Sequence, residues 1–329
     1  MKKNFLIVTV LVVAAFTFFA ACGGANESSS GTPGTNNTNA NVNATTSAAT
    51  PTEAPATTPA ETNGGNEAAP AAQLPTGAIH VITREAGSGT RDAFVEVTGI
   101  FADGEDRTWE EAPVGTGTGA IITTIAENTA AMGYISLGAL RDDVRAVAVN
   151  GVEATADNII NGTYPLFRSF YLALPAELND LAKDFIRFIE SEEGQAIIAG
   201  RGYIATVENP KPFEVLNFYG KLEIEGSTSV SPLMNYLVAA YVIHNDGVTI
   251  DVHSTGSGAG ITAAMDGRVH FGMSSRALRE GELAVVDSLT IAHDGIAVIV
   301  NPTNGIPSVS VDEIRQIFMG EITRWDNIN

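Results

Sequence analysis

The amino-acid sequence predicts an α/β protein in which helices alternate with the strands of mostly parallel sheets. Three observations support this class. Strand-like and helix-like segments alternate from residue 78 onward. Glycine-rich turns join a strand to a following helix at three places. Residues 295–300 form a continuous apolar run, which is typical of a strand buried on both faces. Alternation of this kind favours helices packed against a parallel sheet.

The expected elements follow one another along residues 78–319. Strands are expected where apolar residues alternate or run together, and helices where they recur every three or four positions. The expected strands are 78–83, 132–137, 170–174, 221–225, 248–252, 269–273 and 295–300. The expected helices are 91–98, 121–127, 157–161, 176–200, a helix following 226–229, 261–266 and 311–319. The segment 176–200 is interpreted as one long amphipathic helix.

The first 22 residues are interpreted as an export signal. Lys2 and Lys3 precede an almost uninterrupted apolar run at 5–21, and small residues lead into Cys22. Cys22 is the only cysteine, so no internal disulfide can form. Its setting resembles the lipobox of bacterial lipoproteins, which predicts a lipidated N-terminus. An uncleaved membrane anchor is the alternative, and both place the rest of the chain outside the cytoplasmic membrane.

Residues 23–75 are predicted to be a disordered tether. They are rich in Thr, Ala, Asn, Ser, Gly and Pro and contain almost no large apolar residues, so they cannot offset the entropy of ordering. The net charge of −20 argues against a nucleic-acid partner. An acidic chain can still bind an anion when the site consists of local dipoles and hydroxyl groups.

Three turns share a design that suits an anion. Each is built from residues of the types Gly, Ser and Thr, follows a predicted strand and opens a predicted helix. The three turns are 87–90, 226–229 and 256–258. The first amide groups of a helix have no partner inside the helix and lie at the positive end of its dipole. Three such turns, if they converge, would surround one small anion with donors. For any single turn, helix capping by Ser or Thr is the alternative.

Two further segments carry candidate ligand groups. Arg84 ends the first predicted strand, and a guanidinium can contact two phosphate oxygens at once. The alternative is an exposed arginine paired with Glu85. Residues 274–276 (Ser-Ser-Arg) end another strand, where open α/β sheets place ligands. The alternative is a helix cap for the stretch at 277–284.

Taken together, the motifs resemble the phosphate-binding proteins of bacterial ABC phosphate importers. The resembling segments are 83–91, 133–138, 226–234, 256–260, 271–276, 294–298 and 318–325. The resemblance implies a two-lobed, periplasmic-binding-protein-like clamshell of type II that closes on its anion without a cofactor. It places the ligand contacts on Arg84, Ser88, Gly89, Thr90, Thr228, Ser229, Ser257 and Ser275. It also implies importer membrane subunits as partners and a lipid-anchored location on the extracytoplasmic face.

The chain departs from the family's order of segments. The Gly-Ser-Thr-Ser opening at 226–229 follows the arginine-containing segment at 83–91, whereas in the family it precedes it. This order indicates a circular permutation, which proteins tolerate because chain ends often lie close together. The predicted lobes are 78–166 plus 289–329, and 167–288, with crossings near Phe167 and Ile291. A fragment of a tandem array or a partner-swapped dimer is the alternative.

Two substitutions within the motifs leave the ligand open. Ser275 stands where the family often has Asp, so discrimination between phosphate and sulfate is less assured. Ala86 replaces an acid that commonly follows the ligand arginine, so another acid is expected to hold Arg84. Rival functions are a binding protein for sulfate or molybdate, an anion sensor, and a secreted phosphatase or Ser hydrolase using Ser88 or Ser257. The five histidines show no metal-ligand spacing, and no general base can be named for an enzyme.

Overall fold

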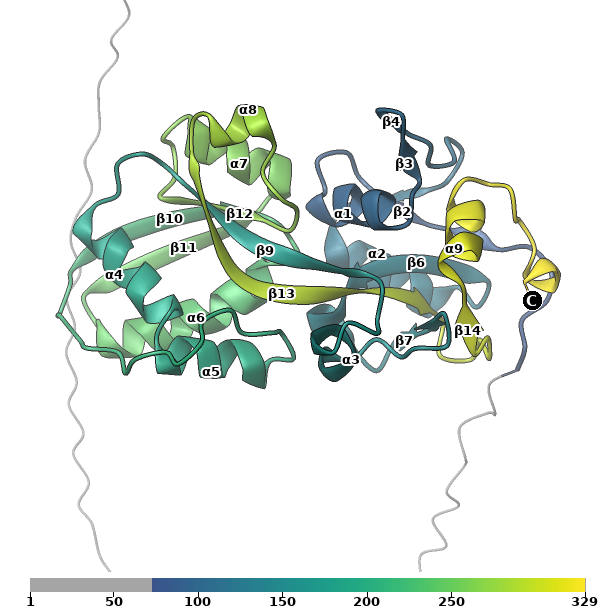
Figure 1. Ribbon diagram of the computed structural model, residues 1–329, viewed down its shortest axis with the longest axis horizontal. Coiled ribbons are helices and arrows are strands. Elements are labelled where there is room, and N and C mark those ends of the chain that lie inside the picture. Colours follow the sequence, from purple (N-terminus) through teal and green to yellow (C-terminus); the bar gives the residue numbers. More distant parts are fainter. Residues whose placement is uncertain (1–72, 329) are drawn as a thin grey trace, which may run out of the picture. The chain divides into compact units, whose positions relative to one another are not determined.

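The computed structural model describes residues 73–328 of the chain (Figure 1). The predicted export signal at 1–22, the lipidation site Cys22 and nearly all of the predicted tether at 23–75 lie outside the described residues. Within residues 73–328, no helix has both the length and the apolar character needed to cross a membrane.

The described chain is built around one mixed sheet of eight strands. Seven of these follow the order β1-β6-β13-β9-β12-β10-β11, and β7 pairs with β13. Their bounds are β1 His80–Val81, β6 Ala131–Ser136, β7 Arg145–Ala146, β9 Phe167–Leu174, β10 Gly220–Gly226, β11 Val248–Ser254, β12 Phe271–Ser274 and β13 Asp287–Val300. The short strands outside it are β2 Thr83–Arg84, β3 Phe101–Ala102, β4 Glu105–Asp106, β5 Val114–Gly115, β8 Ala148–Val149 and β14 Ser308–Val309. The predicted α/β class is therefore confirmed.

Helices connect and cover these strands (Figure 1). Their bounds are α1 Gly89–Val97, α2 Gly117–Glu127, α3 Ala156–Ile160, α4 Asp180–Ile189, α5 Glu192–Gly200, α6 Ser231–His244, α7 Ser257–Met265, α8 Glu280–Leu283 and α9 Val311–Phe318. Two short 3₁₀ helices, η1 Leu137–Ala139 and η2 Trp325–Asn327, complete the inventory of the described residues.

The buried apolar side chains form two groups of clusters. The first group draws on the segments around β1, β6 and α9, and includes Phe94, Tyr134 and Phe318. The second group draws on the segments between β9 and the start of β13, and includes Phe185 and Phe271. We call the parts of the chain that carry these cores the first lobe and the second lobe. The predicted boundaries near residues 166 and 289 stay a prediction, and Leu289, Ile291 and Ala292 pack with the second core.

Strands β9 and β13 carry the chain between the two cores. The first part of β13 pairs with β9 in antiparallel fashion, from Asp287 opposite Leu174 to Gly295 opposite Phe167. The last part of β13 pairs with β6, also antiparallel. The expectation of a mostly parallel sheet is thus wrong at its centre, because one strand leaves the first lobe while the other returns to it. Parallel pairs occur toward the edges, between β1 and β6 and between β10 and its two neighbours.

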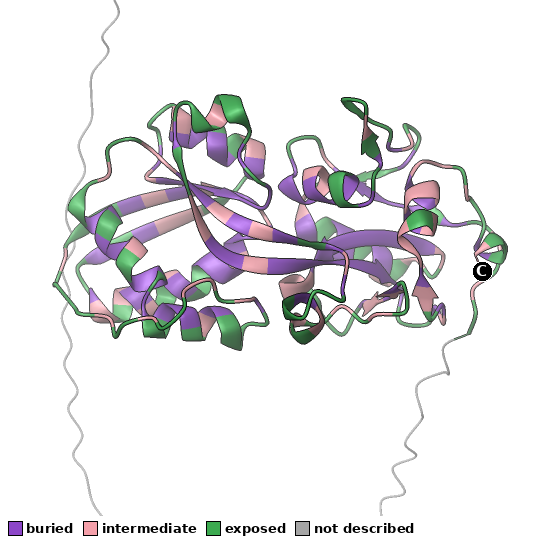
Figure 2. Ribbon diagram, viewed as in Figure 1, coloured by how far each residue is buried: buried purple, intermediate pink, exposed green. Residues whose placement is uncertain are grey.

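The predicted strand at 295–300 is confirmed and is part of a longer one. All six of these residues are buried, as the continuous apolar run indicates (Figure 2). The strand begins earlier, at Asp287, where polar and half-buried residues hide it from a search for apolar runs. The first predicted strand at 78–83 is instead two short pieces, β1 and β2.

The single long helix predicted at 176–200 is wrong, because the structure has α4 and α5 with a break at Ser191. The Ser191 hydroxyl donates to the carbonyl of Phe188 at 2.7 Å and accepts from the amide of Gly194 at 3.2 Å. A Cβ at Gly194 would lie 2.2 Å from that same carbonyl oxygen. A serine N-cap and a closely packed glycine thus define a new helix start within one amphipathic pattern.

Candidate anion-binding site

The starts of four helices contact one another through hydroxyl side chains and one backbone hydrogen bond. Thr90 of α1 and Ser229, just before α6, lie 2.7 Å apart between hydroxyl oxygens. The Thr118 hydroxyl of α2 lies 3.3 Å from those of both Thr228 and Ser229. The amide of Gly258 in α7 donates to the carbonyl of Gly87 at 3.0 Å. The three turns singled out in the sequence therefore meet, and the start of α2 joins them.

Arg84 brings a positive charge to this meeting point. Its side chain is only 1% exposed. Its Nε and Nη2 donate to the two carboxylate oxygens of Glu85, at 2.8 and 2.9 Å, and Nη2 also donates to the Thr228 hydroxyl at 3.0 Å. Nη1 is buried and has no hydrogen-bond partner among the described residues. A buried guanidinium nitrogen without a partner is costly, so it favours an added acceptor such as an anion oxygen.

The backbone of Arg84 is held on both sides. Its carbonyl accepts from Nη1 of Arg91 at 3.1 Å, and the Arg91 Nε donates to Asp106 at 2.9 Å. The Arg84 amide donates to the Tyr134 hydroxyl at 3.3 Å, which also lies 3.0 Å from the Thr83 hydroxyl. Burial raises the pKa of Tyr134 to about 12. The tyrosine therefore stays neutral and remains a hydrogen-bonding group at physiological pH.

Glu85 is the acid that holds Arg84. Burial alone would raise the pKa of Glu85, but the hydrogen bonds and charge of Arg84 and the amide of Gly117, 3.1 Å away, keep it below its ordinary value. The carboxylate is thus ionised at neutral pH. The other acid that the sequence leads us to expect is therefore the adjacent residue, Glu85. The alternative, an exposed arginine paired with Glu85, is correct in the partner but wrong in the exposure, because the Arg84 side chain is buried.

A second part of the site consists of serine hydroxyl groups from the second lobe. Ser227 donates to the Ser275 hydroxyl at 2.9 Å, and Ser275 lies 3.3 Å from the Ser257 hydroxyl. Gly89 of the first lobe packs directly on them: a Cβ there would lie 2.3 Å from the Ser257 oxygen and 2.8 Å from that of Ser275. Only glycine therefore allows the backbone of α1 to approach this closely.

The capping alternative holds for one of the predicted ligand residues. The Ser88 hydroxyl accepts from the amide of Arg91 at 3.3 Å and so caps α1. It does not hold for Ser275, because α8 begins at Glu280 and Arg279 is its N-cap. The remaining predicted residues, Arg84, Gly89, Thr90, Thr228, Ser229, Ser257 and Ser275, are brought together by the contacts above.

Known proteins show the same combination of fold and sequence. A family model described as a PBP superfamily domain matches residues 55–193 and 216–328. The phosphate-binding protein PstS 2 of Streptococcus pneumoniae is 41% identical over 268 residues, covering 80% of this chain and 92% of the relative. PstS 2 of Streptococcus agalactiae is 36% identical over 260 residues, covering 77% and 88%. The chain belongs to the PstS family of the PBP superfamily.

A solved structure agrees with this PstS assignment. The phosphate-binding protein of a phosphate ABC transporter from Streptococcus pneumoniae matches with a TM-score of 0.64 and 42% sequence identity. The match covers 77% of this chain and 100% of the solved one. The two-lobed binding-protein fold predicted from the motifs is thereby confirmed.

Three polar residues of this PstS-family site were missed at the level of sequence. Thr118 lies in a Gly-Thr-Gly-Thr-Gly run at 115–119 that opens α2, so it carries the same signal as the other turns. Ser227 lies inside the turn at 226–229, but the resemblance places ligand contacts only on its two successors, Thr228 and Ser229. Glu85 was considered only as a surface partner of Arg84. Composition of the turn identified the right segments, but it did not rank residues within them.

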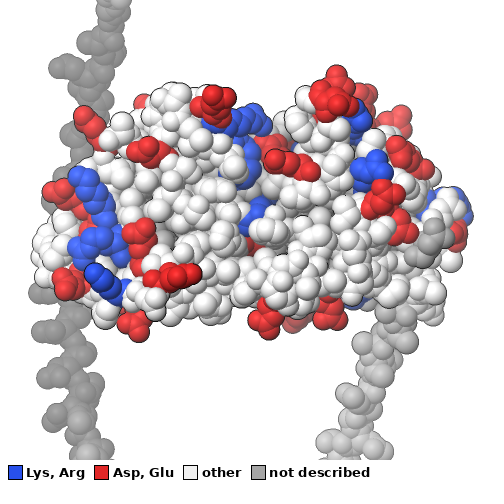
Figure 3. All heavy atoms as spheres, in the orientation of Figure 1, with Lys and Arg blue, Asp and Glu red and all other residues white. Residues whose placement is uncertain are grey.

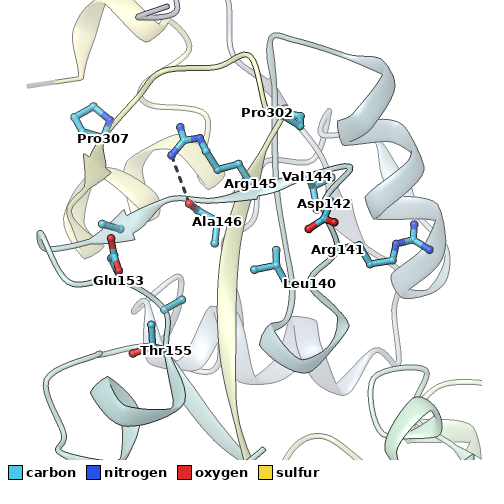
Figure 4. A pocket seen from close by; sticks show the side chains of 12 residues that line it. Leu140, Arg141, Asp142, Val144, Arg145, Ala146, Glu153, Thr155, Pro302 and Pro307 are labelled. Carbon is cyan, nitrogen blue, oxygen red and sulfur yellow. Dashed lines mark hydrogen bonds between the residues drawn. The ribbon is translucent and has the colours of Figure 1, made fainter. Parts of the chain in front are cut away.

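The site consists mainly of hydroxyl groups and one guanidinium group. Within residues 73–328, no cluster of three or more His, Cys, Asp or Glu side chains could hold a metal ion. A separate hollow in the first lobe is lined by Arg141 and Arg145, and Figure 4 shows Arg145 donating to the carbonyl of Ala146. Arg145 also donates to the carbonyls of Asn304 and Ile306. None of the residues lining that hollow belongs to the group of hydroxyl side chains around Arg84 described above. The convergent donors around Arg84 are therefore the stronger candidate for binding an anion.

Proposed function

We propose that this chain binds inorganic phosphate between its two lobes and delivers it to the membrane subunits of an ABC importer. The observation that supports this most strongly is the buried Nη1 of Arg84, which lacks a hydrogen-bond partner among the described residues. The Arg84 side chain contacts Thr228, which belongs to a group of hydroxyls from the starts of α1, α2 and α6. Its PstS relatives are binding proteins, so the activity is capture and release rather than turnover. No cofactor is needed.

The donors match the chemistry of a small four-oxygen anion. Arg84 supplies a charge-assisted hydrogen bond, and hydroxyls and helix-start amides supply neutral donors around it. We propose as ligand contacts Arg84, Gly89, Thr90, Thr228, Ser229, Ser257 and Ser275, with Ser88 contributing through the start of α1 that it caps. Because Glu85 already offsets the arginine charge, much of the stabilisation of the anion comes from dipoles that are fixed by the fold.

The remaining architecture is proposed from the sequence patterns. The lobes comprise 78–166 plus 289–329, and 167–288, in an order that is permuted relative to the family. Cys22 follows the export signal and carries the lipid anchor, which holds the protein on the extracytoplasmic face of the membrane through the 23–75 tether. Gel mobility of the wild type and of the Cys22→Ser variant, each expressed with and without globomycin, tests the anchor. Identical processing of the wild type and the variant would refute it.

Ser275 leaves the discrimination between phosphate and sulfate to be measured. A carboxylate near the ligand can accept the proton of hydrogen phosphate and repels fully ionised sulfate, whereas a serine hydroxyl can donate to either. Isothermal titration of the dialysed protein with phosphate, sulfate and molybdate tests the proposal. Binding of phosphate in preference to the others is expected. Absence of heat with phosphate, together with binding of sulfate or molybdate, would transfer the function to that anion. Hydrolysis of a chromogenic phosphate ester would make the chain an enzyme instead.

A further inference from the structure

An acidic residue of the first lobe is paired with two arginines of the second lobe. Asp92 of α1 accepts from Arg279 Nη2 at 3.1 Å, and its Oδ2 lies 2.9 Å from Arg276 Nε. Nearby Phe94 packs in the first core, while Leu278 packs in the second. These ion pairs therefore connect the two lobes. Figure 3 shows basic and acidic side chains side by side where α8 and α1 approach each other.

The paired residues adjoin the ligand segments directly. Asp92 lies two positions after Thr90 on the same helix, and Arg276 immediately follows Ser275. Within residues 73–328, the side chains of Asp92 and Arg276 make no hydrogen bond to the side chain of a proposed ligand residue, so we separate their role from coordination of the anion. Movement that separates the lobes must break these ion pairs together with the contacts of the anion.

The guanidinium of Arg276 is oriented by a second carboxylate, besides its ion pair with Asp92. Its Nη1 and Nη2 donate to the two carboxylate oxygens of Glu282 at 2.8 and 2.7 Å, and its side chain is 8% exposed. This bidentate pair fixes the orientation of the guanidinium, and its Nε makes an ion pair with Asp92 at 2.9 Å without a hydrogen bond of good geometry. Arg279 is 70% exposed, so salt screens its contribution much more strongly. The Arg276 contact is therefore expected to dominate.

We propose that Asp92, Arg276 and Arg279 form an interlobe clasp that sets how long the bound anion is retained. The inference rests on the proposed function. Asp92 acts as a positioning residue: it stabilises the closed arrangement and does not itself bind phosphate. Since the clasp forms only when the lobes are together, its loss raises the dissociation rate and leaves the association rate nearly unchanged.

Stopped-flow measurement of phosphate release tests the clasp. The Asp92→Asn variant is expected to release phosphate about tenfold faster, with an association rate within about twofold of wild type. Asp103→Asn is the matched control, because it removes the same charge from an exposed ion pair with Arg107 inside the first lobe. Added salt should reduce the difference between the two variants, since the clasp is partly exposed.

The outcomes separate the clasp from the proposed function. Equal release rates for wild type and Asp92→Asn would overturn the clasp, and so would an equal acceleration by Asp103→Asn. If the wild type binds no phosphate, the proposed function fails. Small-angle X-ray scattering of the ligand-free proteins then tests the clasp by itself. A larger radius of gyration for Asp92→Asn, but not for Asp103→Asn, supports the clasp, and an unchanged radius overturns it. If Asp92→Asn does not fold, the exposed Arg279→Gln replaces it, with an expected acceleration of about twofold.

Discussion

Two buried arginines, Arg84 and Arg168, illustrate two uses of the same side chain. Both are almost fully buried and both contact a carboxylate. Arg84 is paired with its neighbour in sequence, Glu85, whose side chain is 21% exposed. Arg168 is paired across strands β9 and β13 with Asp294, which lies directly opposite it in the register and is fully buried.

The electrostatics of the two carboxylates run in opposite directions. The pKa of Glu85 is held below its ordinary value, because its contacts outweigh the effect of burial. The pKa of Asp294 is raised by burial, which Arg168 and the amide of Gly138 only partly offset. Burial also lowers the pKa of Arg168, and the positive charge of Arg84 adds to this. In the Arg84–Glu85 pair the charged form of Glu85 is stabilised, and Nη1 of Arg84 has no partner among the described residues. In the Arg168–Asp294 pair, between β9 and β13, burial disfavours both charged forms.

The difference indicates separate roles. Arg84 lies among hydroxyls and helix starts, where a ligand can complete its hydrogen bonds. Arg168 contacts the Phe170 ring, 5.3 Å from its centroid, and joins the two strands that connect the lobes. We therefore expect substitution of Arg84 to affect mainly affinity and substitution of Arg168 to affect mainly stability.

The largest effect is expected for Arg168→Ala. Removing the guanidinium leaves Asp294 buried without its cation, so the free energy of unfolding should fall by about 3–5 kcal/mol. Urea denaturation in phosphate-free buffer measures this. Arg141→Ala, which removes one member of an exposed ion pair, is the control and should cost no more than about 1 kcal/mol. Similar losses for the two variants would erase the contrast with Arg84.

Arg84→Ala should weaken phosphate binding by about 2–5 kcal/mol, because the buried anion loses its charged donor. Its effect on unfolding of the ligand-free protein should be smaller than that of Arg168→Ala, since Glu85 keeps access to water. Calorimetric titration and urea denaturation of both variants give the comparison. Unchanged affinity in Arg84→Ala would remove Arg84 from the site.

Gly89→Ala tests the close approach of the first lobe to Ser257 and Ser275 of the second lobe. The added Cβ would meet the oxygens of Ser257 and Ser275 well inside contact distance, so affinity should drop by about 1–3 kcal/mol. Gly119→Ala is the matched control in the first turn of α2, where a Cβ meets no atom within 4 Å. An equal effect of the two substitutions would show that helix starts, rather than the approach of the lobes, matter here.

The smallest effect concerns acid stability and Glu85. A carboxyl group whose folded pKa is depressed contributes stability above its unfolded pKa of about 4.3, and this stability is lost as pH falls through the folded pKa. Glu85→Gln should therefore lower the melting temperature at pH 7 but hardly at pH 3. Thermal unfolding across this range, in phosphate-free buffer, measures the difference. A constant offset at every pH would mean that the charge of Glu85 is not what stabilises the pair.

Local sequence patterns were sufficient to predict where several helices begin. The glycine, serine and threonine turns identified the starts of α1, α6 and α7, because helix starts with orphan amides have a recognisable composition. The helix predicted at 121–127 is α2, and the same rule applied to residues 115–119 places its start at Gly117 and identifies Thr118. The break at Ser191 was not visible, because an amphipathic repeat can continue across two helices that share one buried face.

The sequence by itself determined the α/β class, the turns that bear donors and the presence of an arginine among them, since these depend on neighbouring residues. Only the tertiary structure decided that β9 and β13 run antiparallel between the cores, that Glu85 holds Arg84, and that Asp92 faces two arginines from the other lobe. Such pairings depend on side-chain direction and on contacts between residues far apart in the chain. Spacing along the sequence contains no direct record of either.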